Sequence, residues 1–216
     1  MIDYKGHLSI SKRRIVAPYG EIVGYASSNV PAYSNANDDY SAGRNSLYGV
    51  TMGAKWQCVE YARRWLFLQK GCVFDDVDDA ADIWDLEIVQ RVADKKCFNF
   101  IRHPDGSLSP PQNESLLIYA RSNRGIPYGH VAVIVDVSPT FIRVAEQNYD
   151  RFYWEGNYAR QIPYKLIRGR YYIQDYYTVI GWMTIEFDKE TKPLDRSTID
   201  QIIQWRGASP DFRCRH

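Results

Sequence analysis

The chain has 216 residues, of which 45% are hydrophobic and 25% charged, and its formal net charge is +1. This length suffices for one domain with a sizeable core, and the lack of a basic tail or patterned basic helix argues against nucleic acid as a partner. The longest aliphatic stretch, residues 131–135, is far too short to cross a membrane.

The pattern divides the chain into three parts. Residues 1–17 are expected to be a mobile, basic lead-in without the apolar segment of a secretory signal, 18–187 to form the main domain, and 188–216 to be a C-terminal extension. The four cysteines show no CxxC, zinc-ligand or disulfide-framework spacing. We therefore expect no metal site, no dithiol redox site and a cytoplasmic location.

In chain order, Val30–Val50 is rich in Asn, Ser, Tyr and Gly and is expected to be a long loop that leads to a helix beginning at Cys58. Glu60 precedes Arg63 and Arg64 by three and four residues on the polar face of this helix. The apolar residues that recur at three- and four-residue steps are Val59, Ala62, Trp65 and Leu66.

The placement of Cys58 at a helix start favours a thiolate, because unpaired N–H groups and the positive end of the dipole lie there. Lowering the thiol pKa by two units takes roughly 2.7 kcal/mol, whereas a helix terminus supplies about 1 to 2 kcal/mol. A second cation is needed, and histidine is the usual one. The alternative is a packed thiol, which suits Cys72 better than Cys58, since Trp56 and Gln57 do not continue a core pattern.

The acidic run Asp75–Asp79 has two interpretations. Asp75 and Asp76 could attract a cationic substrate, or the run could be solvated with Asp78 or Asp79 capping the next helix. That second helix is expected to carry one apolar face made of Ala81, Trp84, Ile88 and Val92.

Of the four histidines, only His130 has a fixed scaffold in the sequence. His7 lies in the lead-in, His216 is the last residue, and His103 lies in a turn-like segment. His130 introduces Val131–Val135, a run typical of a buried strand, and is therefore the best candidate for a base.

A hairpin is expected to bring Glu146 toward His130. Two strand-like runs, Val131–Val137 and Phe141–Glu146, flank the turn signal Ser138-Pro139-Thr140. A turn centred at Ser138 places Glu146 opposite His130, and one centred at Pro139 places it diagonally on the same face. A centre midway between them would separate the two residues onto opposite faces. Asn148 shares the parity of Glu146 and is the competing partner for the imidazole.

The rest of the chain contributes fewer elements. Ser115–Tyr119 is expected to be a strand, Asp150–Tyr172 is aromatic-rich and has no assignment, and Tyr176–Phe187 is expected to end the sheet. A short helix is expected over Thr198–Trp205, capped by Ser197 and stopped near Gly207.

Several motifs together resemble the amidase domain of glutathionylspermidine synthetase/amidase. They are Pro18–Ala26, the run Lys55–Leu68 around Cys58, Gly129–Ala132, Ala145–Asn148 and Gly181–Met183. That domain belongs to the cysteine, histidine-dependent amidohydrolase/peptidase superfamily. The resemblance implies a papain-like α+β fold, in which a nucleophile at a helix N-terminus packs on an antiparallel sheet carrying the histidine.

The resemblance also implies a reaction for residues 18–187. Cys58, His130 and Glu146 fall on the nucleophile, base and orienting carboxylate of the family. The implied activity is hydrolysis of the amide between glutathione and a polyamine, without cofactor or metal. In the bifunctional members an ATP-grasp synthetase domain follows the amidase, and nothing comparable is expected after Phe187.

Four residues are candidates for substrate binding: Gln57, Arg63, Asn148 and Trp56. Gln57 could donate to the oxyanion through its side chain, although the Cys58 N–H at the helix start is the more secure donor. Arg63 could bind a glutathione carboxylate or pair with Glu60, and Trp56 could wall the site or only pack. An amidase for peptidoglycan stem peptides and a non-catalytic binding module of the same fold are the alternatives.

Overall fold

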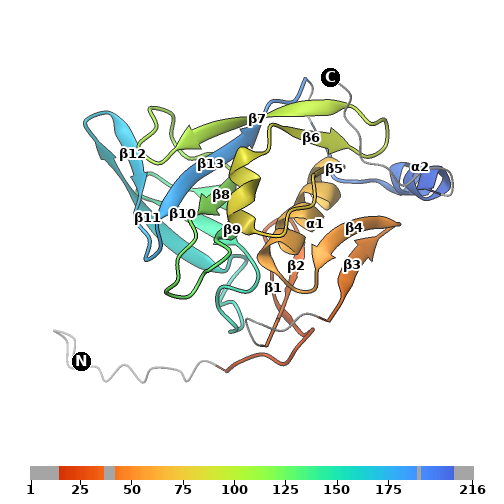
Figure 1. Ribbon diagram of the computed structural model, residues 1–216, viewed down its shortest axis with the longest axis horizontal. Coiled ribbons are helices and arrows are strands. Elements are labelled where there is room, and N and C mark those ends of the chain that lie inside the picture. Colours follow the sequence, from red (N-terminus) through yellow and green to blue (C-terminus); the bar gives the residue numbers. More distant parts are fainter. Residues whose placement is uncertain (1–14, 37–41, 189–190, 207–216) are drawn as a thin grey trace.

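The computed structural model describes residues 15–36, 42–188 and 191–206. Its centre is a nine-stranded sheet in which every neighbouring pair is antiparallel, in the order β12-β11-β10-β9-β8-β13-β7-β6-β5 (Figure 1). The strands are β5 (Cys72–Phe74), β6 (Ile88–Arg91), β7 (Cys97–Pro104), β8 (Leu116–Tyr119), β9 (His130–Val137), β10 (Phe141–Ala145), β11 (Arg160–Ile167), β12 (Arg170–Ile173) and β13 (Val179–Ile185).

Two small hairpins and three helical segments complete the described fold. The hairpins pair β1 (Ile22–Tyr25) with β2 (Pro31–Tyr33) and β3 (Arg44–Leu47) with β4 (Val50–Ala54). The helical segments are α1 (Cys58–Lys70), a 3₁₀ helix η1 (Ala80–Asp85) and α2 (Arg196–Arg206). The α+β class and the packing of the helix that begins at Cys58 on an antiparallel sheet, both implied by the family resemblance, are confirmed.

Helix α1 begins at Cys58, as its periodicity predicts, and ends where Gly71 takes up the left-handed conformation with φ 66°. It packs against β4, β5 and β9. Its expected polar face is wrong, however, because Glu60, Arg63 and Arg64 are all buried. Buried charges need partners, and the contacts that these three make are described with the site below.

The middle strands of the sheet are covered on both faces, which explains the uninterrupted apolar run of β9. Val131 and Val133 belong to the core cluster that contains Trp65 and Leu66 of α1. The alternate residues of the strand, Ala132 and Ile134, belong to a second cluster on the other face, with Leu117, Ile142, Val144 and Trp182. Because successive side chains point to opposite faces, a strand buried on both sides is apolar throughout.

The β9–β10 hairpin contains a bulge that sets its register. Arg143 pairs with Asp136 near the turn, but Val144 pairs with Ile134, so Val135 is an extra residue on β9. Beyond the bulge the register is the one that a turn centred at Pro139 predicts. His130 and the position of Glu146 are therefore diagonal on one face, the second of the expected arrangements.

Two expectations for elements are wrong, and a third holds only in chain order. The second helix is only the short η1, and Ile88 belongs instead to β6, which pairs with β5 and β7. The long loop expected over Val30–Val50 contains β2 and β3, with 37–41 outside the described residues. The expected last strand is β13, which is last in chain order but lies between β8 and β7 in the sheet. The unassigned aromatic segment supplies β11 and most of β12.

The two ends of the described chain differ from the expected boundaries in detail. Ala17, expected in the mobile lead-in, is fully buried and donates its N–H to the Arg151 carbonyl at 2.9 Å; residues 1–14 lie outside the described part. Helix α2 begins two residues before Thr198 and is capped by Asp195 rather than Ser197, because the Asp195 carboxylate accepts the Thr198 N–H at 2.7 Å. The expected stop at Gly207 lies outside the described residues.

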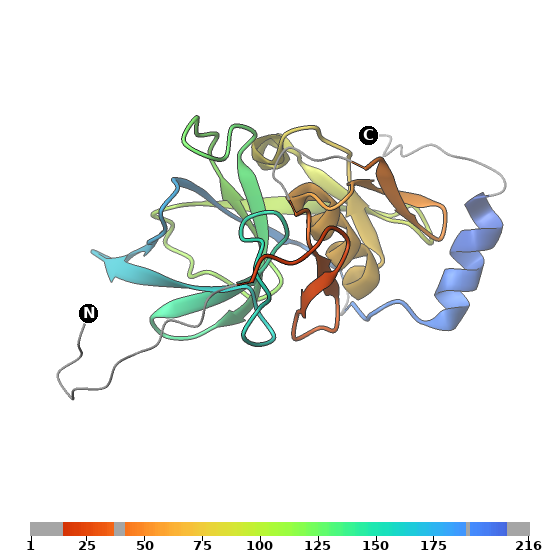
Figure 2. The ribbon, with the colours of Figure 1, turned by 90° about the horizontal axis from the view of Figure 1, so that it is seen from below.

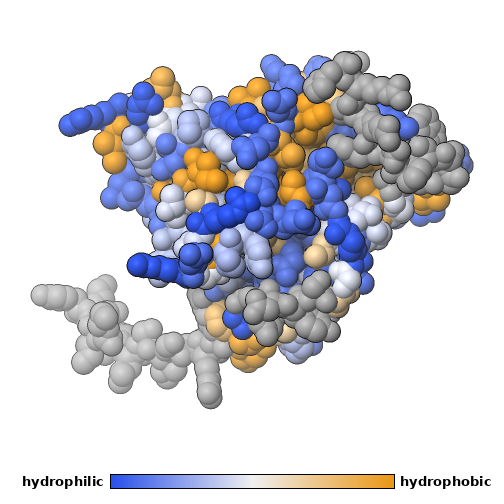
Figure 3. Space-filling model, in the orientation of Figure 1, coloured by the Kyte–Doolittle hydropathy of each residue, from blue (hydrophilic) through white to orange (hydrophobic). Residues whose placement is uncertain are grey.

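Helix α2 lies at one end of the molecule, beyond β3 and β4 (Figure 2). Its Ile202 packs with Val50, Met52, Phe67 and Val73. On the face drawn in Figure 3, hydrophobic residues form separate patches between hydrophilic ones. Within the described ranges, no helix is both long and apolar enough to span a membrane.

Candidate active site

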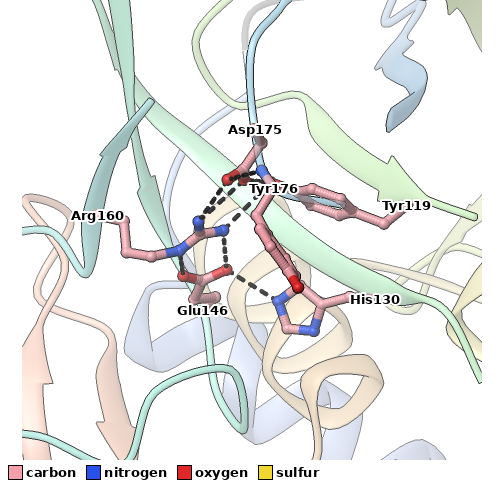
Figure 4. Close-up of polar contacts among 6 residues, drawn as sticks. All are labelled: Tyr119, His130, Glu146, Arg160, Asp175 and Tyr176. Atoms are coloured by element: carbon pink, nitrogen blue, oxygen red, sulfur yellow. Dashed lines mark hydrogen bonds and ion pairs between the residues drawn. The ribbon is translucent and has the colours of Figure 1, made fainter. Parts of the chain in front are cut away.

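Cys58, His130 and Glu146 form one continuous line of contacts. Cys58 opens α1, His130 opens β9, and Glu146 follows the last residue of β10. The Cys58 thiol interacts electrostatically with His130. His130 Nε2 lies 2.8 Å from Glu146 Oε2 (Figure 4). Because Nε2 faces the carboxylate, Nδ1 is the ring nitrogen available to the thiol. The 2.8 Å between His130 and Glu146 lies in the range of a normal hydrogen bond, roughly 2.6–3.2 Å.

The electrostatics of this line favour a thiolate–imidazolium pair. Burial alone raises the pKa of Cys58, but the His130 charge and hydrogen bond outweigh it, helped by the backbone N–H groups of Val131 and Val59, so the pKa is lowered. Burial alone lowers the pKa of His130, but Cys58 and then Glu146 outweigh it and raise the pKa to about 9. The His130 imidazolium is therefore the second positive charge that a thiolate at Cys58 needs in addition to the helix start.

Arg160 of β11 is a site residue that sequence reasoning missed. Its guanidinium donates to both oxygens of Glu146 and, through another nitrogen, to Asp175 at 2.9 Å (Figure 4). Burial raises the pKa of Glu146, but Arg160 first and His130 next outweigh it and lower the pKa to about 2. Fourteen residues separate Arg160 from Glu146 in the chain, and no spacing pattern links them.

A second missed group joins the chain after Glu146 to the start of α1. The Gln147 amide donates to Glu60 at 2.9 Å and to the Gln57 carbonyl at 3.3 Å. Its oxygen accepts from Arg64 at 2.7 Å and from the Tyr33 N–H at 2.8 Å. Glu60 and Arg64 also pair with each other at 2.6 Å, and both are buried. This network fixes the strand that carries Glu146 against the helix that carries Cys58.

Two of the four expected substrate-binding residues lie together beside Cys58. Gln57 is the N-cap position of α1, directly before Cys58. Its side-chain oxygen accepts a hydrogen bond from the Asn148 amide at 2.6 Å. Asn148, considered as a partner for the imidazole, thus contacts Gln57, while Glu146 contacts His130. Trp56 packs on Tyr33 with ring centroids 4.2 Å apart, which accounts for its position.

Arg63 is not brought to the site. Its guanidinium donates to the backbone carbonyls of Phe74 and, at 3.0 Å, Thr51, and the side chain is buried. These two backbone carbonyls account for both terminal nitrogens of Arg63 without a substrate carboxylate. The alternative pairing with Glu60 is also wrong, because Arg64 is the arginine that pairs with Glu60. Spacings of three and four residues are both compatible with a helical ion pair, so the sequence could not separate the two.

The acidic run is used for surface ion pairs. Asp76 pairs with Arg44, and Asp79 accepts from Arg121 at 2.8 Å. Asp79 occupies the N-cap position of η1, so its place is as expected but its carboxylate is directed at Arg121. The described contacts of this run favour the structural interpretation over cation binding.

Gly129 fixes the start of β9. It has φ +72°, and a Cβ on it would lie 2.7 Å from the Tyr119 carbonyl oxygen and 2.8 Å from the Ala81 Cβ. The η1 segment thus approaches the backbone directly before His130, which leaves room only for glycine.

A polar groove of about 560 Å³ lies at the other end of α1, lined by Lys70 and Glu114 among others. In the described ranges, no group of three or more His, Cys, Asp or Glu side chains is arranged to hold a metal ion.

Comparison with known proteins matches the segment that carries this site. Residues 49–148 match the model of the CHAP domain. The chain is 35% identical over 174 residues to trypanothione synthetase of Crithidia fasciculata, covering 77% of this chain and 26% of that protein. It is 33% identical over 205 residues to the bifunctional glutathionylspermidine synthetase/amidase of Escherichia coli, covering 89% of this chain and 33% of that protein.

The chain therefore spans a third or less of the length of these relatives. Among solved structures, the crystal structure of Ly7917 aligns with a TM-score of 0.34 and 17% identity over 68% of this chain and 56% of that one, too low a similarity to carry an argument. Cys58, His130 and Glu146 all fall inside the matched segment. Residues 49–148 are similar to the CHAP domain, and the fold is the papain-like cysteine/histidine amidohydrolase fold.

Proposed function

We propose that the chain is a cysteine amidase that hydrolyses the amide between glutathione and a polyamine through a thioester on Cys58. The observation that carries this proposal is the line of contacts from the Cys58 thiol through His130 to Glu146. A half-buried thiol with a lowered pKa, paired with a buried imidazole with a raised pKa, is the arrangement that nucleophilic catalysis requires.

In the proposed reaction, the Cys58 thiolate attacks the glycyl carbonyl of the substrate. The imidazolium of His130 gives its proton to the departing amine as the C–N bond breaks and the C–S bond forms. The neutral imidazole then takes a proton from water, whose oxygen attacks the thioester carbonyl. The C–S bond breaks, glutathione leaves as the carboxylic acid and gives its proton to the solvent, and the thiolate–imidazolium pair is restored. Glu146 stabilises the charged imidazole in each resting state.

The oxyanion has donors close to Cys58. The Cys58 N–H lies at the start of α1, where backbone N–H groups have no partner inside the helix. The Gln57 side chain is the second proposed donor. Asn148 donates to its carbonyl oxygen and so defines which end of the amide accepts. Gln57 and Asn148 are thus proposed to hold the substrate, and this role requires no contact between Asn148 and His130.

The substrate class rests on the relatives rather than on geometry. One similar protein is named for glutathionylspermidine synthesis and amide cleavage, and another for trypanothione synthesis. We propose a glutathione–polyamine conjugate for this chain on that ground. Location in the cytoplasm stays a prediction. That prediction depends on cysteines that form no disulfides. Cys97 is disulfide-bonded, which removes part of this support.

A parallel hydrolysis assay tests the substrate class. The chain is incubated with glutathionylspermidine, with a glutathione amide of another polyamine and with a muropeptide, and the released amine and acid are quantified. Cys58→Ala serves as the control for background hydrolysis. We expect both glutathione conjugates to be cleaved faster than the muropeptide. Faster cleavage of the muropeptide would favour a peptidoglycan amidase, and no cleavage of any substrate would favour a non-catalytic module.

A further inference from the structure

The Glu146 carboxylate is held from two sides, and only one of them is the catalytic histidine. Arg160 Nε donates to Glu146 Oε1, and a terminal nitrogen of the same guanidinium lies 3.3 Å from Oε2. His130 Nε2 approaches that second oxygen at 2.8 Å. The planar fork of an arginine matches the two oxygens of a carboxylate and so fixes the plane of the Glu146 carboxylate.

Arg160 is itself held in place by groups from other elements. Its other terminal nitrogen lies 3.2 and 2.9 Å from the two oxygens of Asp175, which follows β12. The hydroxyl of Tyr119 lies 3.2 Å from Arg160 and donates to Asp175 at 2.7 Å. The ring of Tyr149 covers the guanidinium, with 3.5 Å between the guanidinium carbon and the ring centroid. The arginine can therefore transmit a fixed geometry to Glu146.

These groups form a row of alternating charges: Asp175, Arg160, Glu146, His130 and Cys58. We propose that Arg160 is a positioning residue, which keeps Glu146 ionised and aimed at His130, and that Asp175 and Tyr119 hold Arg160 for this task. The inference rests on the proposed function, because it takes the Cys58–His130 pair as the acting pair. It goes beyond the three catalytic candidates by assigning a role to the next layer of residues.

The loss of Arg160 has a predictable sign. Glu146 is almost fully buried, and burial favours its neutral form. With a neutral residue at position 160, Glu146 and Asp175 lose the positive charge between them, so Glu146 takes up a proton at higher pH. A protonated Glu146 cannot stabilise imidazolium, and the thiolate is lost with it. His130 and Arg160 contact Glu146, the ionisable side chains of Tyr61, Tyr119 and Tyr149 are coupled to it electrostatically, and Asp175 contacts the Arg160 guanidinium.

The experiment needs no substrate. Alkylation of Cys58 by iodoacetamide is measured from pH 4 to 9, with the modified cysteine identified by peptide mass spectrometry, in the parent, Arg160→Gln and Arg160→Lys. Arg91→Gln is the matched control, because Arg91 also forks onto a carboxylate, that of Asp94, away from the site. Circular dichroism checks that each variant is folded, and Arg160→Met is the second neutral variant should the glutamine variant fail to fold.

We expect the pH below which Cys58 loses reactivity to rise by about one unit in Arg160→Gln, a roughly tenfold loss at pH 5 that shrinks toward pH 8. Arg160→Lys should keep the parent's inflection because it keeps the cation, and Arg91→Gln should match the parent. An equal loss at every pH would indicate a purely structural role, and an unchanged profile would exclude any role; either overturns the inference. A parent Cys58 no more reactive than Cys72 would instead overturn the nucleophile assignment and this inference with it.

Discussion

His130 Nε2 lies 2.8 Å from Glu146 Oε2, and both side chains are almost fully buried. Away from solvent, the interaction of a charged imidazole with a carboxylate is strong. If the Glu146 carboxylate loses its negative charge, the His130 imidazolium is left buried without a partner. In the proposed reaction, the contact therefore helps His130 to keep its proton until the amine leaves. The contact also distinguishes the role of Glu146 from that of Asn148, whose side chain contacts Gln57 instead.

We expect Glu146→Gln to lose more activity than Asn148→Ala, because a neutral amide keeps the shape of the carboxylate but cannot stabilise imidazolium. The loss in turnover for Glu146→Gln should be about two to four powers of ten. Turnover and KM are measured for both variants at equal protein concentration. A larger loss of turnover in Asn148→Ala would show that the wrong residue is assigned to the imidazole.

Cys58→Ala should abolish amide hydrolysis while the fold is retained. Loss of a nucleophile that works as a unit with its base typically lowers turnover by about four to six powers of ten. Saturating substrate and equal concentrations of variant and parent give the comparison, with thermal unfolding as the control for the fold. Activity within tenfold of the parent would mean that another residue is the nucleophile.

Thiol reactivity should separate Cys58 from Cys72 by pH. The pKa of Cys58 is lowered by His130, and the pKa of His130 is raised to about 9, so the thiolate–imidazolium pair is favoured below about pH 9 and is lost as His130 deprotonates above it. Burial raises the pKa of Cys72 to about 12, which leaves it a thiol over the same range. At pH 6 an alkylating reagent should modify Cys58 and spare Cys72. Turnover should fall above about pH 9, as His130 loses the proton that the leaving amine needs. Equal modification of the two cysteines would exclude activation of Cys58.

Gly129→Ala should destabilise the fold more than Gly169→Ala. Both positions have positive φ, +72° and +76°, so the backbone strain is matched. The added Cβ at Gly129 meets the Tyr119 carbonyl at 2.7 Å, whereas no described neighbour lies within 4 Å of one at Gly169. Overpacking adds about 1–3 kcal/mol to the free-energy difference at Gly129. Denaturant unfolding of the two variants measures this difference in stability. Equal stabilities would contradict the close approach of η1 to β9.

Gln147→Met should lower the free energy of unfolding by about 2–3 kcal/mol, because buried Glu60 and Arg64 each lose a hydrogen-bond partner. Gln161→Met is the control, since Gln161 is exposed on β11. The stabilities of both variants are compared by urea unfolding. A loss no larger than that of the control would show that water replaces the Gln147 amide without penalty.

The parts of the site that the sequence predicts are those that depend on local pattern. Apolar spacing predicts the helix that begins at Cys58, and the aliphatic run after His130 predicts a buried strand; both are confirmed. The apolar pattern of the two strands does not by itself place His130 and Glu146 on the same face of the sheet. Near the turn, the β9–β10 register alone would place them on opposite faces, and the extra residue Val135 restores the match. Nothing in the spacing of the two strands specifies that bulge.

The parts that sequence reasoning missed depend on contacts between distant segments. Arg160 and Gln147 acquire their roles only when β11 and the end of β10 meet the other elements. The expected second helix failed for a related reason. Its apolar residues have helical spacing, but Ile88 lies in a strand because β6 completes its hydrogen bonds with β5 and β7. Pairing partners far along the chain outweighed the local periodicity.

The most direct test of the account is to trap the acyl-enzyme. The chain is mixed with glutathionylspermidine in the presence of a phosphine reductant, quenched in acid within the first turnovers, and analysed by intact and peptide mass spectrometry. The account predicts an adduct on Cys58 with the mass of glutathione less water, resistant to the reductant and removed by hydroxylamine as glutathione hydroxamate, and the absence of this adduct in Cys58→Ala. Cleavage of the substrate without any such adduct, or an adduct on another residue, would contradict it.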